Sequence, residues 1–257
     1  MTLRVLVTGA ATGIGRSIAD SFAQDGNRVH VCDNAAEHID ECLSESPSLS
    51  ATQCDVSNVE QIEKLFRDVQ KELGGLDVLV NNAGIAGPTA PVEDIEPGDW
   101  NKTVEVGLNG AFYCSRLAVP LLKQNTTGSI VNISSTAGIM GFPLRTPYAA
   151  AKWGIIGLTK SLAMELGRFN IRVNAVCPGS VDGPRMDRVI AADAKAQGVA
   201  EDEIRQAYKN QASMQTFIDR QDIANTVVFL CSEKGNKISG QVISVDGHGE
   251  TLRTQEH

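Results

Sequence analysis

Short runs of apolar residues recur along the chain, and most are followed by a stretch with helical spacing. Continuous apolar runs of this kind are typical of strands that a parallel sheet buries on both faces. The runs cover residues 3–7, 28–32, 51–54, 76–80, 129–133, 171–177 and 241–245. Helical patterns cover residues 16–24, 59–69, 97–123, 146–168 and 222–231. This alternation predicts an α/β fold: one doubly wound parallel sheet of about seven strands, with helices on both faces.

Residues 182–216 interrupt this alternation with a polar and charged stretch. It has helical character but little apolar periodicity, and an insertion of this kind is typical of a mobile segment over a substrate. No repeat, low-complexity linker or change of composition divides the chain. We therefore expect a single domain over residues 1–257, with a substrate lid at about residues 182–216. The polar tail 248–257 either is disordered or reaches a neighbouring subunit.

Composition changes this picture mainly by excluding other classes of protein. The chain has 257 residues, 42% hydrophobic and 21% charged, an ordinary balance for a globular domain. A net charge of −8 without a basic run indicates neither nucleic-acid nor membrane partners. The six cysteines and four histidines are scattered, so we expect buried reduced thiols and no metal site. No run reaches membrane-spanning length and no signal peptide is recognised, so we expect a cytoplasmic protein.

A glycine-rich turn follows the first predicted strand. Gly9, Gly13 and Gly15 have the spacing Gly-x-x-x-Gly-x-Gly and precede a helical segment. Glycines let the backbone approach a pyrophosphate, and a helix N-terminus offers it unpaired N–H groups. A purely structural turn would contain the same glycines, so the order of strand, turn and helix is what indicates a dinucleotide site.

Asp33 stands at the end of the second predicted strand. A carboxylate there accepts hydrogen bonds from the adenosine ribose hydroxyls and repels a 2′-phosphate. The residue before Gly13 is Thr12, so no basic side chain is available there for that phosphate. The pattern predicts NAD rather than NADP as the cofactor. The alternative is that Asp33 caps the following helix.

Tyr148 and Lys152 are four residues apart, one turn apart on the same face of a helix. A tyrosine has a pKa of about 10, so it ionises near neutrality only where the local field favours the phenolate. A lysine ammonium and a cationic cofactor ring supply such a field, and Ser135 is a candidate partner for a substrate oxygen. The three residues predict proton transfer for an alcohol/carbonyl pair, although a Tyr–Lys pair at this spacing also occurs by chance.

Further motifs follow later strands: Asp55-Val56, Asn81-Asn82-Ala83-Gly84 and Pro178-Gly179. Together with the glycine turn, Asp33, Ser135 and Tyr148-x-x-x-Lys152, they resemble the short-chain dehydrogenase/reductase family over roughly residues 3–247. The resemblance implies a Rossmann-type sheet of seven strands, a nicotinamide cofactor and reversible oxidation of an alcohol to a carbonyl. It also implies a homotetramer or homodimer formed partly through the helices over 97–123 and 146–168.

The resemblance assigns roles to individual residues of this chain. It implies that Tyr148 is the catalytic acid/base, that Lys152 lowers its pKa and binds the nicotinamide ribose, and that Ser135 holds the substrate oxygen. The cofactor site that it implies consists of Gly9, Gly13, Ile14, Gly15, Asp33, Asp55, Val56, Asn82, Ala83, Gly84, Tyr148, Lys152, Pro178, Gly179 and Val181.

One departure from the family's pattern falls in Val106-Gly107-Leu108-Asn109-Gly110. The family usually has asparagine where this chain has Gly107, and that residue's main-chain carbonyl helps to hold a water linked to the lysine. Our hypothesis is that Gly107 keeps the carbonyl accessible, so that the water path survives without the side chain. The glycine costs about 1 kcal/mol relative to alanine inside a helix. Asn109 faces elsewhere and does not substitute.

Three arginines bear on the substrate. Arg145 precedes Tyr148 between two prolines that stiffen the loop, and the lid contains Arg185 and Arg188. Guanidinium groups that converge on an apolar pocket bind a carboxylate or a sulfonate. The alternative is that these arginines are solvated or form ion pairs between subunits.

The sequence thus predicts an NAD-dependent oxidoreductase that interconverts a secondary alcohol and a ketone or aldehyde on a small molecule. Two alternatives stay open. An NADP-dependent 3-oxoacyl-type reductase would share the fold, and Asp33 and Thr12 argue against it. A non-catalytic nucleotide-sensing protein would usually lack part of the Ser135, Tyr148 and Lys152 set, which is complete here.

Overall fold

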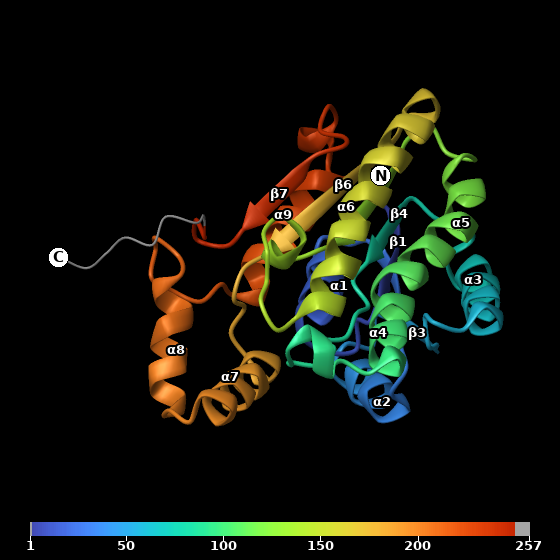
Figure 1. Cartoon of the computed structure of the whole chain (residues 1–257). Coiled ribbons are helices and arrows are strands. Elements are labelled where there is room, and N and C mark those ends of the chain that lie inside the picture. The colour runs from blue at the N-terminus through green and yellow to red at the C-terminus, as the bar shows by residue number, and fades with distance from the viewer. Residues whose placement is uncertain (1, 250–257) are drawn as a thin grey trace.

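The computed structural model describes residues 2–249 and consists of a seven-stranded parallel sheet between two layers of helices (Figure 1). The strands are β1 (Arg4–Thr8), β2 (Arg28–Asp33), β3 (Ser50–Gln53), β4 (Val78–Asn81), β5 (Gly128–Ile133), β6 (Ile171–Pro178) and β7 (Val242–Val245). Their order in the sheet is β3-β2-β1-β4-β5-β6-β7. The predicted fold is confirmed. Because the chain winds outward in both directions from β1 and β4, the carboxyl ends of these strands flank the crevice where such folds bind ligands.

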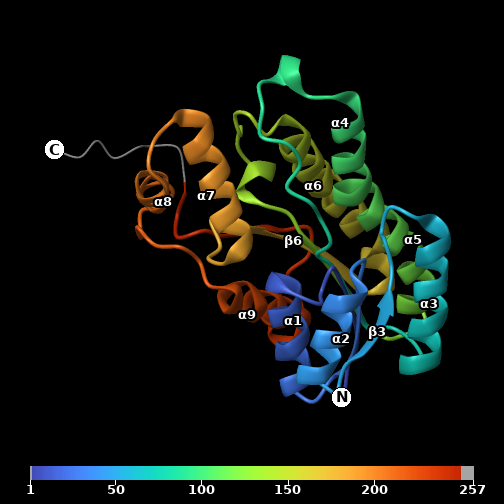
Figure 2. The ribbon, with the colours of Figure 1, turned by 90° about the horizontal axis from the view of Figure 1, so that it is seen from below.

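Each face of the sheet has its own apolar core. The helices are α1 (Gly13–Gln24), α2 (Ala36–Glu45), α3 (Val59–Leu73), α5 (Gly110–Leu122), α6 (Thr146–Leu166) and α9 (Arg220–Cys231). α1, α2 and α9 cover one face, while α3, α5 and α6 cover the other (Figure 2). Along β1, Val5 and Val7 belong to the first core and Leu6 to the second, since successive strand side chains point to opposite faces. All six cysteines are free and buried, as predicted.

The single long helix predicted over 97–123 is wrong. The segment divides into α4 (Pro97–Val104), a π-helical turn (Glu105–Asn109) and α5. Gly107 lies buried in this turn, and a Cβ added to it would lie 3.3 Å from the Cβ of Ala151 on α6. The apolar pattern continues through the π-helical turn, so the periodicity of the sequence does not reveal this turn. The distortion is therefore present without an asparagine at position 107.

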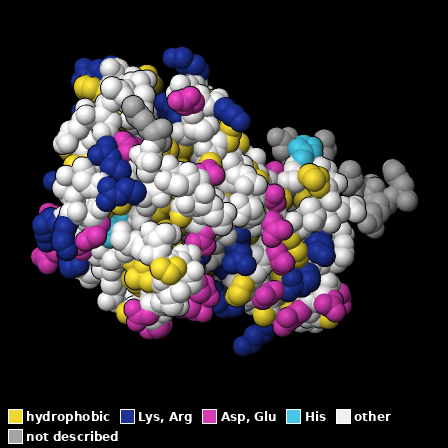
Figure 3. Space-filling model, turned by 180° about the vertical axis from the view of Figure 1, so that it is seen from behind, with side chains coloured by type: hydrophobic (Ala, Val, Ile, Leu, Met, Phe, Trp, Pro, Cys, Tyr) yellow, Lys and Arg dark blue, Asp and Glu magenta, His cyan; other side chains and the backbone are white. Residues whose placement is uncertain are grey.

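The predicted lid forms a small helical lobe beside the main body (Figures 1 and 2). It contains α7 (Pro184–Gln197) and α8 (Glu201–Asn210). The prediction of little apolar periodicity is wrong here. Met186, Ile190 and Ala194 recur every four residues along α7 and pack with Ile204 of α8 in a separate core. Acidic and basic side chains intermingle on the surface of this lobe (Figure 3). In the sequence they stand between the apolar residues, so the apolar periodicity of α7 is hard to recognise.

A backbone bridge joins the segment that leads from β6 into the lobe to the segment that leads from the lobe to α9 (Arg220–Cys231). Val181 bridges Ile218, whose carbonyl accepts a hydrogen bond from the Asp182 N–H at 3.0 Å. Of the predicted tail 248–257, residues 250–257 lie outside the described part of the chain. Among the helices within residues 2–249, none combines the length and the apolar character needed to cross a bilayer.

Candidate active site

The turn after β1 and the loop after β4 pack closely at the carboxyl edge of the sheet. Gly9 has a φ of +60°, and an added Cβ would lie 2.7 Å from the Cα of Ala83. At Gly15 an added Cβ would lie 2.4 Å from the Nδ2 of Asn82. No other residue fits either position without a shift of its neighbours, because real Cβ contacts are longer. Two of the predicted cofactor glycines are thus required by this packing.

Asn82 holds the two loops together. Its Nδ2 donates to the carbonyl oxygens of Gly9 at 2.7 Å and Thr8 at 3.0 Å. The backbone N–H groups of Asn82 and Ala83 both donate to the Thr8 Oγ1 at 3.1 Å. The Asn82 amide therefore fixes the shape of the glycine turn. Thr8 shares this role, and the sequence analysis missed it because the two residues are far apart in the chain.

The start of α1 suits a pyrophosphate. In the first helical hydrogen bond of α1, Arg16 N donates to the carbonyl oxygen of Thr12 at 3.2 Å. The preceding N–H groups, those of Gly13, Ile14 and Gly15, have no partner inside the helix. The first turn contains no acidic residue, and an added Cβ at Gly13 would meet no atom within 4 Å. Open space, free N–H groups and the positive end of the helix dipole fit an anionic phosphate group.

Asp33 faces this turn from the end of β2. Its Oδ2 accepts a hydrogen bond from Ala11 N at 3.2 Å, and its Oδ1 accepts one from Asn34 N at 2.9 Å. The residue that caps α2 is Ala35, without a side-chain capping bond, so Asp33 is not the helix cap of the alternative interpretation. The Oδ1 also accepts a longer bond from Ala35 N at 3.4 Å, while the Oδ2 keeps a further acceptor site. The arrangement fits a ribose hydroxyl of an adenosine.

Asp55 and Val56 follow β3, and both side chains contact other residues of the protein. The Asp55 Oδ1 accepts hydrogen bonds from Ser57 N at 2.9 Å and Ser57 Oγ at 2.7 Å. Lys102 forms an ion pair with the Asp55 Oδ2 at 3.5 Å. Burial acts to raise the pKa of Asp55, but the Ser57 hydrogen bonds and Lys102 outweigh it and lower that pKa. Val56 is buried, so both side chains serve packing and loop structure.

Pro178, Gly179 and Val181 lie at the same edge, where β6 ends. Gly179 N donates to the carbonyl of Val245 at 3.0 Å, next to the end of β7. Val181 forms the bridge to Ile218. The fold thus brings every predicted cofactor residue to the carboxyl ends of the strands or to α6. The side chains of Asn82, Asp55, Val56 and Val181 are engaged in contacts within the protein.

The end of β5 anchors α6 and positions the three candidate catalytic residues. The Lys152 Nζ donates to the carbonyl of Ile133 at 2.8 Å, and the Ser134 Oγ donates to the carbonyl of Lys152 at 2.9 Å. Ser135 follows directly, and its Oγ accepts a hydrogen bond from Ala137 N at 3.2 Å. The Lys152 Nζ lies 5.7 Å from the centroid of the Tyr148 ring. Ser135, Tyr148 and Lys152 therefore form one cluster.

The electrostatic surroundings favour ionisation of Tyr148. Burial acts to raise its pKa, but the positive charges of Lys152, Arg185 and Arg145 and a hydrogen bond from Ser135 outweigh it, so the pKa is lowered. Burial also lowers the pKa of Lys152, which the phenolate of Tyr148 partly opposes. A phenol that ionises more readily than free tyrosine, beside a hydroxyl donor, is able to act as a general base and acid.

Arg145 differs in its surroundings from the other two arginines predicted to bear on the substrate. It is only 7% exposed, and its Nη2 donates to the carbonyl of Ala86 at 2.8 Å. Its guanidinium carbon lies 5.2 Å from the centroid of the Tyr148 ring. Arg185 and Arg188, by contrast, are exposed side chains of α7. The three arginines line one cavity, but Arg145 is held against Tyr148 by the protein, whereas Arg185 and Arg188 are exposed.

A chain of buried polar side chains lies beneath the site, and the sequence analysis missed it. The Asn81 Nδ2 donates to the Asn132 Oδ1 at 2.8 Å and to the Ser115 Oγ at 3.1 Å. The Asn132 Nδ2 donates to the Thr159 Oγ1 at 2.9 Å. These bonds join α5, β4, β5 and α6. The signal in the sequence is an asparagine within each of two otherwise apolar strands.

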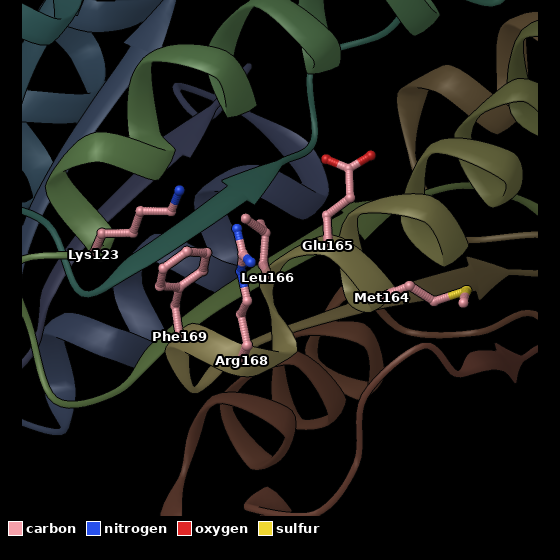
Figure 4. A pocket seen from close by; sticks show the side chains of 6 residues that line it. All are labelled: Lys123, Met164, Glu165, Leu166, Arg168 and Phe169. Carbon is pink, nitrogen blue, oxygen red and sulfur yellow. The ribbon is translucent and has the colours of Figure 1, made fainter.

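A pocket remote from these residues lies at the C-terminal ends of α5 and α6 (Figure 4). It is lined by Lys123, Met164, Glu165, Leu166, Arg168 and Phe169. The Lys123 Nζ lies 4.0 Å from the centroid of the Phe169 ring. With a rise of 1.5 Å per residue, Met164 is about 24 Å along the helix from Tyr148. This pocket is therefore separate from the proton-transfer cluster.

Comparisons with known proteins agree with this geometry. Residues 9–248 match the family described as enoyl-(acyl carrier protein) reductase. A 3-oxoacyl-[acyl-carrier-protein] reductase of Staphylococcus aureus is 36% identical over 96% of this chain and 98% of that protein. A 3beta-hydroxysteroid dehydrogenase of Mediterraneibacter gnavus is 34% identical over 95% of this chain and 93% of that protein.

The fold comparison gives the same result. The crystal structure of a variant of actinorhodin polyketide ketoreductase with NADPH superposes with a TM-score of 0.92 at 33% identity. The match covers 96% of each chain. With its parallel sheet, glycine turn and Ser135–Tyr148–Lys152 cluster, this chain belongs to the short-chain dehydrogenase/reductase family of oxidoreductases.

Proposed function

We propose that this protein is an NAD-dependent oxidoreductase that interconverts a secondary alcohol and a ketone, or an aldehyde, on a small molecule. The observation that carries the proposal is the placement of Tyr148 among Lys152, Arg145 and Arg185, which lowers the pKa of its phenol. A tyrosine with no chemical role would gain nothing from three nearby cations, two of which are buried.

Tyr148, Ser135 and Lys152 have different roles in the reaction. In the oxidising direction the Tyr148 phenolate takes the hydroxyl proton of the alcohol, while Ser135 donates a hydrogen bond to the same oxygen. Lys152 stabilises the phenolate through its positive charge. A nicotinamide cofactor held at this site would supply the redox chemistry, as the acceptor of a hydride from the alcohol carbon. In the reducing direction Tyr148 returns its proton to the carbonyl oxygen.

Asp33 supports NAD as the cofactor. Its carboxylate faces the glycine turn through the hydrogen bond from Ala11 N, where a 2′-phosphate would meet a negative charge. Arg16 is the nearest arginine in sequence to the turn, and its side chain is already paired with Asp20 at 2.7 Å and Glu45 at 3.4 Å. Thr12 supplies no positive charge.

The second candidate is an NADPH-dependent 3-oxoacyl reductase. The similarity to the Staphylococcus aureus reductase and to a ketoreductase solved with NADPH favours it. The carboxylate of Asp33 favours NAD instead. A direct comparison of the two cofactors separates these candidates, because both share the same fold and the same catalytic cluster.

The test measures kcat/KM for NADH and NADPH with one ketone, chosen from a panel of oxo sugars, cyclic ketones, oxosteroids, oxo acids and acyl thioesters. We expect NADH to be preferred at least about tenfold, which corresponds to about 1.4 kcal/mol of repulsion between the Asp33 carboxylate and a 2′-phosphate. In the double variant Asp33→Ser/Thr12→Arg the preference should move toward NADPH. Equal or better use of NADPH by the unaltered protein would overturn the NAD assignment.

We also propose that the protein is a homotetramer or homodimer. Large apolar side chains are exposed on α4, α5 and α6: Trp100, Phe112, Trp153 and Met164. Met164 is 88% exposed and Trp153 is 51% exposed. Apolar surface of this kind is buried in obligate interfaces. Light scattering should give a mass above 27.4 kDa per particle, and Trp153→Glu should reduce it.

A further inference from the structure

A cavity lined by the two arginines nearest the Tyr148 ring, Arg145 and Arg185, is strongly basic, although the protein as a whole is acidic. The cavity has a volume of about 340 Å³. Its ten lining residues include Arg145, Arg185 and Arg188. Three of these residues are arginines and none is acidic, in a chain with a net charge of −8.

Two of the arginines extend from the beginning of α7. Arg185 and Arg188 are three residues apart, so they project from the same face of the helix. The guanidinium carbon of Arg185 lies 6.0 Å from the centroid of the Tyr148 ring. Both side chains are exposed at the cavity. Arg185 is close enough to the phenol to contact a compact substrate that also reaches Tyr148, and Arg188 lines the same cavity.

The carboxylates near these arginines are engaged elsewhere. Arg205 of α8 forms ion pairs with Asp187 and, at 3.9 Å, with Asp182. The Tyr208 hydroxyl donates to the Asp193 Oδ2 at 2.6 Å. Within residues 2–249, no carboxylate lies within 4.0 Å of the guanidinium nitrogens of Arg185 or Arg188. Their positive charge therefore faces the cavity without compensation from the described protein.

Arg145 adds to this field from the cavity wall. Its side chain is more than nine-tenths buried, with one bond to the carbonyl of Ala86. Its Nε is buried and has no hydrogen-bond partner in the described chain. A buried guanidinium donor without a partner is costly, and an anion at the cavity would reduce that cost electrostatically. The basic character of the cavity thus comes from two independent elements, α7 and the start of α6.

We infer that the substrate carries an anionic group, a carboxylate, sulfonate or phosphate, and that Arg185 and Arg188 bind it. Planar guanidinium groups match such oxyanions through paired N–H donors. The short distance from Arg185 to Tyr148 places the anion near the carbon that is oxidised, as in a small hydroxy or oxo acid. The anion itself does not react: the alcohol loses its hydroxyl proton to Tyr148, and a bound NAD would take up the hydride from its carbon. This inference rests on the proposed function.

Matched substrate pairs test it. Each ketone in the panel is supplied as an anion and as a neutral analogue of similar size, for example acetoacetate and methyl acetoacetate, with sulfonate and phosphate members beside them. We expect kcat/KM with NADH to favour at least one anion over its neutral analogue by ten- to hundredfold, the effect of one or two charge-assisted hydrogen bonds. Preference for the neutral analogue in every pair would overturn the inference while leaving the oxidoreductase proposal intact.

The arginine variants identify the site. Arg185→Met/Arg188→Met should raise KM for the anion about ten- to hundredfold. Loss of Arg185 also raises the pKa of Tyr148, which affects both members of a pair alike, so the readout is the ratio of kcat/KM for the anion to kcat/KM for the neutral analogue, which should fall about ten- to hundredfold. Arg168→Met, at the far end of α6, is the matched control and should change neither. Equal losses for both members of a pair would show that the arginines maintain structure and do not select charge.

A binding measurement separates this inference from the proposed function. Malonate, propanesulfonate and inorganic phosphate are titrated against the NADH complex by calorimetry, without turnover. Binding of at least one anion that is lost in Arg185→Met/Arg188→Met supports the inference even if no ketone in the panel is reduced. Binding of none of the three, or binding unchanged in the double variant, overturns it.

Discussion

The guanidinium of Arg145 lies over the ring of Tyr148, with 5.2 Å between its central carbon and the ring centroid, and it is fixed there by the carbonyl of Ala86. A buried cation in this position acts on the phenol whether or not substrate is present. Together with Lys152 it opposes the effect of burial, which alone would raise the pKa of Tyr148. We infer that Arg145 is a positioning residue that tunes the acid/base group.

Arg145→Met should therefore shift the pH profile of kcat. Loss of the cation raises the pKa of the Tyr148 phenol, so alcohol oxidation should fall at neutral pH and recover at alkaline pH. Arg145→Lys keeps the positive charge, so the pH profile of its kcat should lie between that of Arg145→Met and that of the unaltered protein. An equal loss at every pH would show that Arg145 acts only through loop structure.

Tyr148→Phe removes the proton-transferring hydroxyl. We expect kcat to fall by about 10²- to 10⁴-fold, the usual contribution of general acid–base catalysis. Dinucleotide binding, followed by the fluorescence of bound NADH, should persist. Tyr113→Phe on α5 is the matched control and should retain activity. Undiminished turnover in Tyr148→Phe would falsify the proposed mechanism.

Gly15→Ala should damage the cofactor site. The added Cβ would lie 2.4 Å from the Asn82 Nδ2 and 2.5 Å from the Gly9 carbonyl oxygen. Forcing these groups apart costs about 1–3 kcal/mol, so both thermal stability and NADH affinity should decrease. Gly98→Ala on α4, where an added Cβ meets no atom within 4 Å, is the control. Unchanged NADH affinity in Gly15→Ala would contradict the close packing of the turn.

Gly107→Asn tests whether the π-helical turn already provides the carbonyl geometry. The turn is present with glycine, and the new Cβ would lie 3.3 Å from the Ala151 Cβ, a contact that small movements relieve. We expect turnover to change by less than about tenfold, or about 1.4 kcal/mol. A rise of more than about tenfold with an unchanged KM would show that the native water path is impaired.

His30 should make stability depend on pH. It is buried in β2, with its Nδ1 2.8 Å from the Ser50 Oγ and its Nε2 3.0 Å from the Thr52 Oγ1. Thr52 donates to Asp68, so the hydroxyl oxygen of Thr52 accepts from the imidazole, which is neutral. Burial lowers the pKa of His30 to about 4, against opposing effects of Asp68 and Glu72, while Lys64 lowers it further.

The sign follows from the unfolded state, where the histidine pKa is about 6.5. The unfolded chain takes up the proton first on acidification, so stability is full above pH 6.5 and is lost as the pH falls toward 4. The maximum loss is about 3 kcal/mol. Urea unfolding at pH 7.5, 6 and 5 should show it, and His30→Asn should have a flatter dependence. His38→Asn, an exposed site on α2, should keep the native slope.

The sequence by itself determined the sheet and the identity of the main reacting groups. Strands buried on both faces must be apolar throughout, so their positions show in a linear pattern. Tyr148 and Lys152 lie one turn apart on a helix whatever surrounds them, and Asp33 ends a strand that the same pattern predicts. These features depend on local periodicity and on the edge that all parallel strands share, both of which are readable along the chain.

Only the tertiary structure decided what each polar side chain contacts. Asn82 braces the glycine turn through Thr8, Arg145 is buried over Tyr148, and the Asn81–Asn132 bond joins two strands. The π-helical turn and the separate core of α7 and α8 also escaped the linear pattern. The physical reason is that most of these contacts join residues distant in sequence, and that Arg145, although near Tyr148 in the chain, is held over it by the distant Ala86. A polar group meets its hydrogen-bond partner only after the chain has packed. A cation likewise acts on the pKa of a neighbouring group only once packing has brought the two together.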